Sequence, residues 1–123
     1  TATLCLTVAV LLGSAGMSWG ADFNKGWDAY QSGDYATALR EWTPLAEQGD
    51  ADAQYNLGLM YREGQGVMQG YGYAHMWGNI AASNGYEGGE KLRDLAGELL
   101  TPSQLEKAQD LARECVRKKY KGC

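Results

Sequence analysis

The stretch DADAQYNLGLMYREGQGV, Asp50–Val67, decides the fold of this chain. Its apolar residues recur at spacings of three and four, as they do on one face of an α-helix: Ala53, Leu57, Met60 and Tyr61. Gly64 stands where this stripe stops, and glycine is the residue that most easily adopts the left-handed conformation that ends a helix. The stretch therefore predicts an amphipathic helix followed by a glycine turn.

The same layout occurs twice along the chain. A shift of 36 positions places four residues on residues of the same type: Tyr35 on Tyr71, Ala38 on Ala74, Ala46 on Ala82 and Gly49 on Gly85. A shift of 31 places Gly33 on Gly64, so the loop over 64–70 makes the second unit five residues longer. Each unit predicts a helix, a glycine turn, a second helix and another glycine turn.

The predicted fold class is all-α, an α-solenoid of antiparallel helix pairs within one domain over 21–123. We expect one unit at about 22–49, a second at 50–85 and a partial unit at 86–100. Small residues inside the helices would let neighbouring helices approach closely. Tyrosine and tryptophan rings would then fill the remaining volume.

The segment 101–119 is predicted to form a helix that closes this stack. Thr101–Gln104 supplies an N-cap residue, a proline at the first helical position and a glutamine three positions after the cap. The expected apolar stripe of this helix consists of Leu105, Ala108, Leu111, Ala112, Cys115 and Val116. Because a stack of repeats needs an element that covers its last apolar face, we expect this helix to be a C-terminal cap.

Most of residues 21–100 resembles the Sel1-like repeat family, a relative of the tetratricopeptide repeats, in a small exported bacterial form. The resemblance is carried by Asp50–Val67 with Tyr73-Ala74, Trp77, Ala81-Ala82 and Gly85, and in a shorter-loop form by Ala29–Leu39. It implies an α-solenoid that serves as a scaffold for protein–protein contacts, in bacteria often in the envelope. Some cysteine-rich exported relatives bind or slowly hydrolyse β-lactams, but their repeats each carry a disulfide, which this sequence lacks.

Residues 1–20 are predicted to be a signal peptide. This segment has no charged residue, and its apolar run from Leu4 to Leu12 is shorter than the roughly 20 residues of a spanning helix. Ser18 and Gly20 are small residues at positions −3 and −1 of a cut before Ala21. We expect an initiator methionine and a basic region to precede Thr1. The alternative is an uncleaved membrane anchor.

Export affects the interpretation of the cysteines. Cys115 and Cys123 remain in the mature chain, in a compartment where disulfides persist. Their separation of eight positions would let the chain after the last helix fold back and hook onto it. We therefore predict a Cys115–Cys123 disulfide, with two unpaired thiols as the alternative.

The charge distribution disfavours nucleic-acid binding. The net charge is −4, with 6 basic and 14 acidic residues over 1–112 and 5 basic and 1 acidic over 113–123. An acidic body repels phosphate backbones. The basic end is expected to complement the dipole of the last helix, or to touch an acidic partner or an anionic membrane surface.

The sequence offers no recognisable catalytic motif, so we predict no enzymatic activity, no cofactor and no metal. His75 is the single imidazole, expected on the surface or in an interhelical hydrogen bond, with no second base at a useful spacing. No serine is followed three positions later by the lysine of penicillin-recognising enzymes. The Gly64-Gln65-Gly66 loop lacks the lysine and spacing of a phosphate-binding loop.

The aromatic residues point to protein binding. Tyrosine and tryptophan supply contact area at little entropic cost and are enriched in interfaces. We predict a groove for a peptide or protein segment, lined by Tyr55, Asn56, Arg62, Tyr71 and Tyr73. In the alternative, these rings pack between helices and cover one another.

Together these features predict a periplasmic or secreted, non-catalytic scaffold that binds a protein or peptide partner of the envelope and no nucleic acid. Two other functions stay open. One is a weak β-lactam-binding or hydrolysing enzyme, and the other is an accessory subunit tethered to the membrane by an uncleaved N-terminus.

Overall fold

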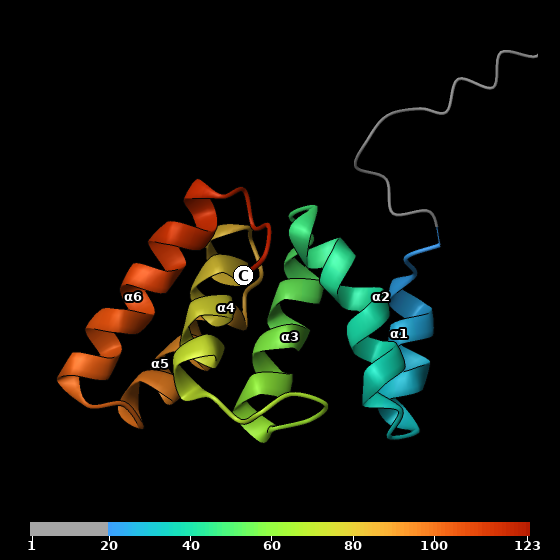
Figure 1. Ribbon diagram of the computed structural model, residues 1–123, viewed down its shortest axis with the longest axis horizontal. Coiled ribbons are helices and arrows are strands. Elements are labelled where there is room, and N and C mark those ends of the chain that lie inside the picture. The colour runs from blue at the N-terminus through green and yellow to red at the C-terminus, as the bar shows by residue number, and fades with distance from the viewer. Residues whose placement is uncertain (1–19) are drawn as a thin grey trace, which may run out of the picture.

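The computed structural model describes residues 20–123, and this part of the chain is helical without any strand (Figure 1). Apart from Gly20, the predicted signal peptide lies outside the described residues. The six helices are α1 (Phe23–Gln31), α2 (Tyr35–Glu47), α3 (Ala51–Glu63), α4 (Tyr71–Ser83), α5 (Gly89–Glu98) and α6 (Pro102–Arg117). The all-α fold class predicted from the sequence is confirmed.

Each helix packs on the next one along the chain from α1 to α5, and α6 packs on α4. In Figure 1 the first five helices follow one another in chain order across the molecule, with α6 at the end away from α1. Helix α3 also touches α5.

Side-chain caps fix where several of these helices begin. Asp50 accepts a hydrogen bond from the backbone N–H of Ala53 (3.0 Å), and Asp34 caps α2 in the same way through Thr37. Thr101 and Gln104 form the complete capping box that the sequence predicts at the start of α6. These contacts satisfy backbone donors that the first turn of a helix leaves free.

Glycines occupy the left-handed conformation where the helices turn. The φ angles are 83° at Gly33, 94° at Gly49, 67° at Gly64 and 95° at Gly85. A side chain makes this conformation costly, so glycine at these four positions separates one helix from the next.

The core is built from many alanines and a few large side chains. Trp42, Met60, Met76, Ile80 and Leu92 are the main bulky residues that are fully buried. Helices α4 and α5 come especially close, since a Cβ added to Gly78 would lie 2.8 Å from the backbone nitrogen of Arg93. Small residues thus permit backbone-to-backbone contact where larger ones would separate the helices.

The last helix differs from its prediction in two respects. It ends at Arg117, before the predicted position 119, because Lys119 and Tyr120 adopt positive φ angles of 54° and 66°. Its expected apolar stripe is also only half buried: the small residues Ala108, Ala112 and Cys115 face the core, whereas Leu111 and Val116 are exposed.

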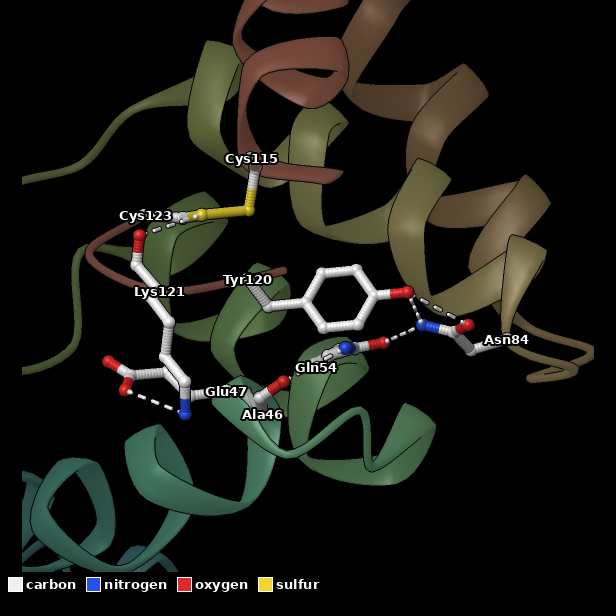
Figure 2. The surroundings of a disulfide bond; sticks show 8 residues. All are labelled: Ala46, Glu47, Gln54, Asn84, Cys115, Tyr120, Lys121 and Cys123. Atoms are coloured by element: carbon white, nitrogen blue, oxygen red, sulfur yellow. Dashed lines mark hydrogen bonds and ion pairs between the residues drawn. A yellow bond between two sulfur atoms is a disulfide. The ribbon is translucent and has the colours of Figure 1, made fainter. Parts of the chain in front are cut away.

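After α6 the chain folds back as a short C-terminal hook, residues 118–123. A disulfide joins Cys123 to Cys115, which is buried in α6, and their Cα atoms are 5.6 Å apart. Figure 2 shows that the hook brings Tyr120 alongside Asn84 and Gln54, at the ends of α4 and α3. The hook therefore ties the last helix to the middle of the molecule.

Candidate functional site

The predicted binding residues come from two helices that pack on each other. Tyr55, Asn56 and Arg62 lie on α3, while Tyr71 and Tyr73 lie in the first turn of α4. The 64–70 loop connects the two groups and folds back onto α2. Gly66 permits this approach, because a Cβ there would be 2.9 Å from the Cβ of Tyr35.

Tyr71 and Tyr73 line an open hollow of about 380 Å³ between the start of α4 and the last two helices. The C-terminal helices contribute leucines to it, Leu99 just after α5 and Leu111 on α6. Lys107 is the charged residue among those that line it. We call this cavity the leucine hollow.

The side chains around the leucine hollow are unusually exposed for their type. The exposed fractions are 41% for Tyr73, 59% for Leu99 and 39% for Leu111. Tyr73 is held in place by stacking on Tyr61, with ring centroids 5.0 Å apart. Burial is the main cause that raises the pKa of Tyr61, and the neighbouring Tyr73 adds to it.

Asn56 lines a different hollow, of about 340 Å³, together with Phe23 and Trp27 of α1 and with Tyr86. Tyr55 lies beside it, because its ring stacks on that of Tyr86 at a centroid distance of 4.2 Å. Burial is the main cause that raises the pKa of Tyr86. This second hollow is aromatic, but its surface also carries polar groups from Asn56 and Asp52.

Arg62 is not among the residues that line either hollow. Its guanidinium pairs with Glu63 at 2.7 Å, and its backbone carbonyl accepts a hydrogen bond from Gln69 of the long loop at 2.8 Å. The five predicted residues are therefore divided: two line the leucine hollow, two belong to the Asn56 hollow and Arg62 supports the loop.

Several residues of these hollows were not predicted from the sequence. Leu111 is expected only in the apolar stripe of the last helix, and Leu99 and Trp27 are not among the predicted binding residues. These residues belong to apolar helix faces that are wider than the area that a neighbouring helix covers. The apolar face can be recognised in the sequence, but the area that the neighbour covers cannot.

His75 differs from its expectation as well. It is buried (5% exposed) and its Nδ1 makes no hydrogen bond, so it is neither a surface residue nor an interhelical hydrogen-bonder through that atom. It lines a hollow of about 610 Å³ with Arg93 and Asp94. Burial, and to a smaller extent Arg93, lower the pKa of His75, which keeps the imidazole neutral.

The hydroxyl groups of two serines are used within their own helices. Ser32 donates to the carbonyl of Ala29 and Ser83 to that of Asn79. Within residues 20–123, no group of three or more His, Cys, Asp or Glu side chains is arranged to hold a metal ion. In the same range, no helix combines the length and the apolar character needed to cross a membrane.

Comparison with known proteins adds no relative: no family model, curated protein or solved structure matches the chain. The case for a function therefore depends on the residues and their arrangement.

Proposed function

We propose that the chain is a non-catalytic protein–protein interaction module of the bacterial cell envelope, built as a short α-solenoid of Sel1-like repeats. Three features support this proposal: the motif over Asp50–Val67, the packing of consecutive helices, and the recurrence of residue types after 36 positions. In this account α6 is the cap, since it lies on α4 beyond the last complete helix pair.

The binding surface in this proposal is the leucine hollow. The observation that carries it is the exposure of Tyr73, Leu99 and Leu111 around one cavity. Exposed apolar residues that gather around a concavity are typical of sites that a partner covers. A partner segment that inserts apolar side chains would remove this surface from water, and burial of apolar surface is the main favourable contribution to such an association.

A non-catalytic role is also supported by the surroundings of the candidate nucleophiles. The residues that line the described hollow around His75 include no serine, threonine or cysteine. Ser32 and Ser83 donate their hydroxyl protons to main-chain carbonyls instead. This arrangement supports a scaffold over the alternative of a β-lactam-hydrolysing enzyme.

An oxidising compartment suits the chain, because disulfides such as Cys115–Cys123 persist there. We therefore place the protein in the periplasm or outside the cell, with residues 1–20 as the export signal. N-terminal sequencing of the purified protein tests this placement. A start at Ala21 supports cleavage, whereas a start at Thr1 or earlier favours a membrane-tethered subunit.

The experiment that tests the binding surface is affinity capture from the native envelope, followed by mass spectrometry. Leu111→Asp puts a charge into the leucine hollow. Val116→Asp is the matched control, because Val116 is also exposed on α6 but borders another cavity, next to Ile80. We expect Leu111→Asp to lose a partner that Val116→Asp retains. Equal recovery with both variants would rule out the leucine hollow.

A further inference from the structure

The C-terminal hook holds a conformation that its residues rarely adopt. Lys119 and Tyr120 are the described non-glycine residues with positive φ angles, and they are consecutive. Such residues persist only where the surroundings hold them in place. Two attachments do this here: the Cys115–Cys123 disulfide at one end and the contacts of the Tyr120 ring at the other.

The Tyr120 hydroxyl is bound by a chain of side-chain amides. It donates to Oδ1 of Asn84 (3.3 Å) and accepts from Nδ2 of the same residue (3.2 Å). That nitrogen also donates to Oε1 of Gln54 at 2.9 Å, and Nε2 of Gln54 donates to the carbonyl of Ala46 at 3.0 Å. Figure 2 shows this chain running from the ring to the end of α2. Three helix ends thus cooperate to bind one phenol.

The same surface contacts the ring and provides a charge for the next residue. Gly49 lies beside the ring, since a Cβ there would be in ordinary van der Waals contact with Cε2 of Tyr120, at 3.7 Å. Nζ of Lys121 is 3.9 Å from Oε2 of Glu47. We call the surface formed by Glu47, Gly49, Gln54 and Asn84 the tyrosine seat.

We propose that the tyrosine seat is a docking site for a partner segment in which a tyrosine is followed by a lysine, and that the hook occupies it in cis while the disulfide is closed. The chemistry of this partner is inferred from the hook, because the seat binds the phenol of Tyr120 and the ammonium of Lys121. The peptide chain after α6 keeps Tyr120 at a high effective concentration whether the disulfide is open or closed. Opening the disulfide removes the constraint that helps to hold Lys119 and Tyr120 at positive φ, so the hook occupies the seat less and a partner competes better.

The covalent step is a thiol–disulfide exchange with a dithiol reductant. A thiolate of the reductant attacks Sγ of Cys123, which is less buried than Cys115, and Cys115 leaves as a thiolate that takes up a proton. The second thiol of the reductant then releases Cys123 as a thiol. The S–S bond of the protein becomes two thiols while the dithiol becomes a disulfide, so two electrons and two protons are transferred.

This inference rests on the proposed function only in that the chain binds protein segments. It uses a different surface from the leucine hollow. Leu111→Asp is therefore expected to leave peptide binding to the tyrosine seat unchanged, so separate measurements distinguish a failure of the leucine hollow from a failure of the tyrosine seat.

The test measures fluorescence anisotropy of the labelled peptide acetyl-Lys-Lys-Tyr-Lys-Gly-amide, which matches residues 118–122. It is titrated with the oxidised full chain and with the full-length variant Cys123→Ser/Tyr120→Ala, which empties the seat. We expect the variant to bind at least tenfold more tightly than the oxidised chain. A peptide with phenylalanine in place of tyrosine should bind at least fivefold more weakly. Equal binding to both proteins, or equal binding of both peptides, would overturn the proposal.

Two controls separate docking from charge attraction and from misfolding. In the seat-emptied background, Glu47→Gln should weaken peptide binding, whereas Glu87→Gln removes an exposed charge outside the seat and should not. Circular dichroism checks that each variant stays helical. If the double variant unfolds, Cys123→Ser replaces it, and binding no tighter than to the oxidised chain then contradicts the proposal.

Discussion

Gly49 and Gly85, 36 positions apart, end α2 and α4 with nearly the same φ angle, 94° and 95°. Other residues related by this shift correspond as well: Tyr35 and Tyr71 begin these two helices, and Ala38 and Ala74 are fully buried. The correspondence accounts for the recurrence of these residue types after 36 positions. The same turn has to be made twice, and each time it requires a residue that tolerates a positive φ.

The first prediction concerns Gly85. No atom lies within 4 Å of a Cβ added there, so Gly85→Ala acts through the backbone alone. We expect a loss of about 1–2 kcal/mol in the free energy of unfolding, measured in urea, because alanine disfavours positive φ. Gly72→Ala is the control. It also adds a methyl group in open space, but within α4, and should stabilise by about 0.5–1 kcal/mol. A loss of stability in both variants, or in neither, would contradict this reading.

The second prediction concerns the close approach of α4 and α5. A Cβ on Gly78 would meet the backbone nitrogen of Arg93 at 2.8 Å and the carbonyl oxygen of Gly89 at 3.0 Å, and backbone atoms cannot rotate away. Gly78→Ala should therefore cost about 1–3 kcal/mol in unfolding free energy. The nearest neighbours of a Cβ on Gly97 are side-chain atoms, the His75 ring at 3.4 Å and Cδ1 of Leu105 at 3.7 Å, so Gly97→Ala should cost less than Gly78→Ala. A stabilised Gly78→Ala protein would show that the two helices are farther apart.

The pH dependence of stability tests the burial of His75. Since the folded-state pKa of His75 is lowered, the unfolded chain takes up a proton first, near the ordinary histidine pKa of about 6.5. Stability should therefore fall as the pH drops from 7.5 to 5.5. The neighbouring Asp94 opposes part of this loss and Arg93 adds to it. The urea midpoint of His75→Gln should change less over this range, and an equal change in both proteins would refute the assignment.

Opening the hook should destabilise the chain. Cys123→Ser leaves Cys115 buried as a small apolar side chain and removes the link that closes a short loop. Loop entropy predicts a loss of about 2–3 kcal/mol, which urea unfolding can measure. Dithiothreitol should shift the wild type by a similar amount and leave Cys123→Ser unaffected. If the variant is as stable as the oxidised wild type, the hook contributes nothing to the fold.

The helices, their ends and the turns between them could be predicted because they depend on local chemistry. Gly33, Gly49, Gly64 and Gly85 mark turns by conformational preference, and Thr101 with Gln104 marks a helix start by hydrogen bonding within four residues. These signals lie within a few residues of the feature that they determine. A periodic apolar stripe then completes the definition of each helix.

The candidate site could be predicted only in part, because it depends on contacts between distant segments. Tyr71 and Tyr73 belong to the predicted surface and do line a hollow. The opposite wall includes Leu99, which was not predicted as a binding residue, and Leu111, which was predicted in the apolar stripe of the last helix. Helix α6 contacts α4 through its small residues, so its larger apolar side chains stay outside. The sequence shows the apolar stripe but does not say which part of it the neighbouring helix covers.

The most direct test of the account is site-specific photo-cross-linking in the native envelope, with benzoylphenylalanine placed at position 99, 111 or 116. If the leucine hollow binds a partner, positions 99 and 111 should yield a cross-link to the same polypeptide, and position 116 should not. Cross-linking that is equally strong at 116, or absent at both 99 and 111 in folded protein, would contradict the proposed interaction surface.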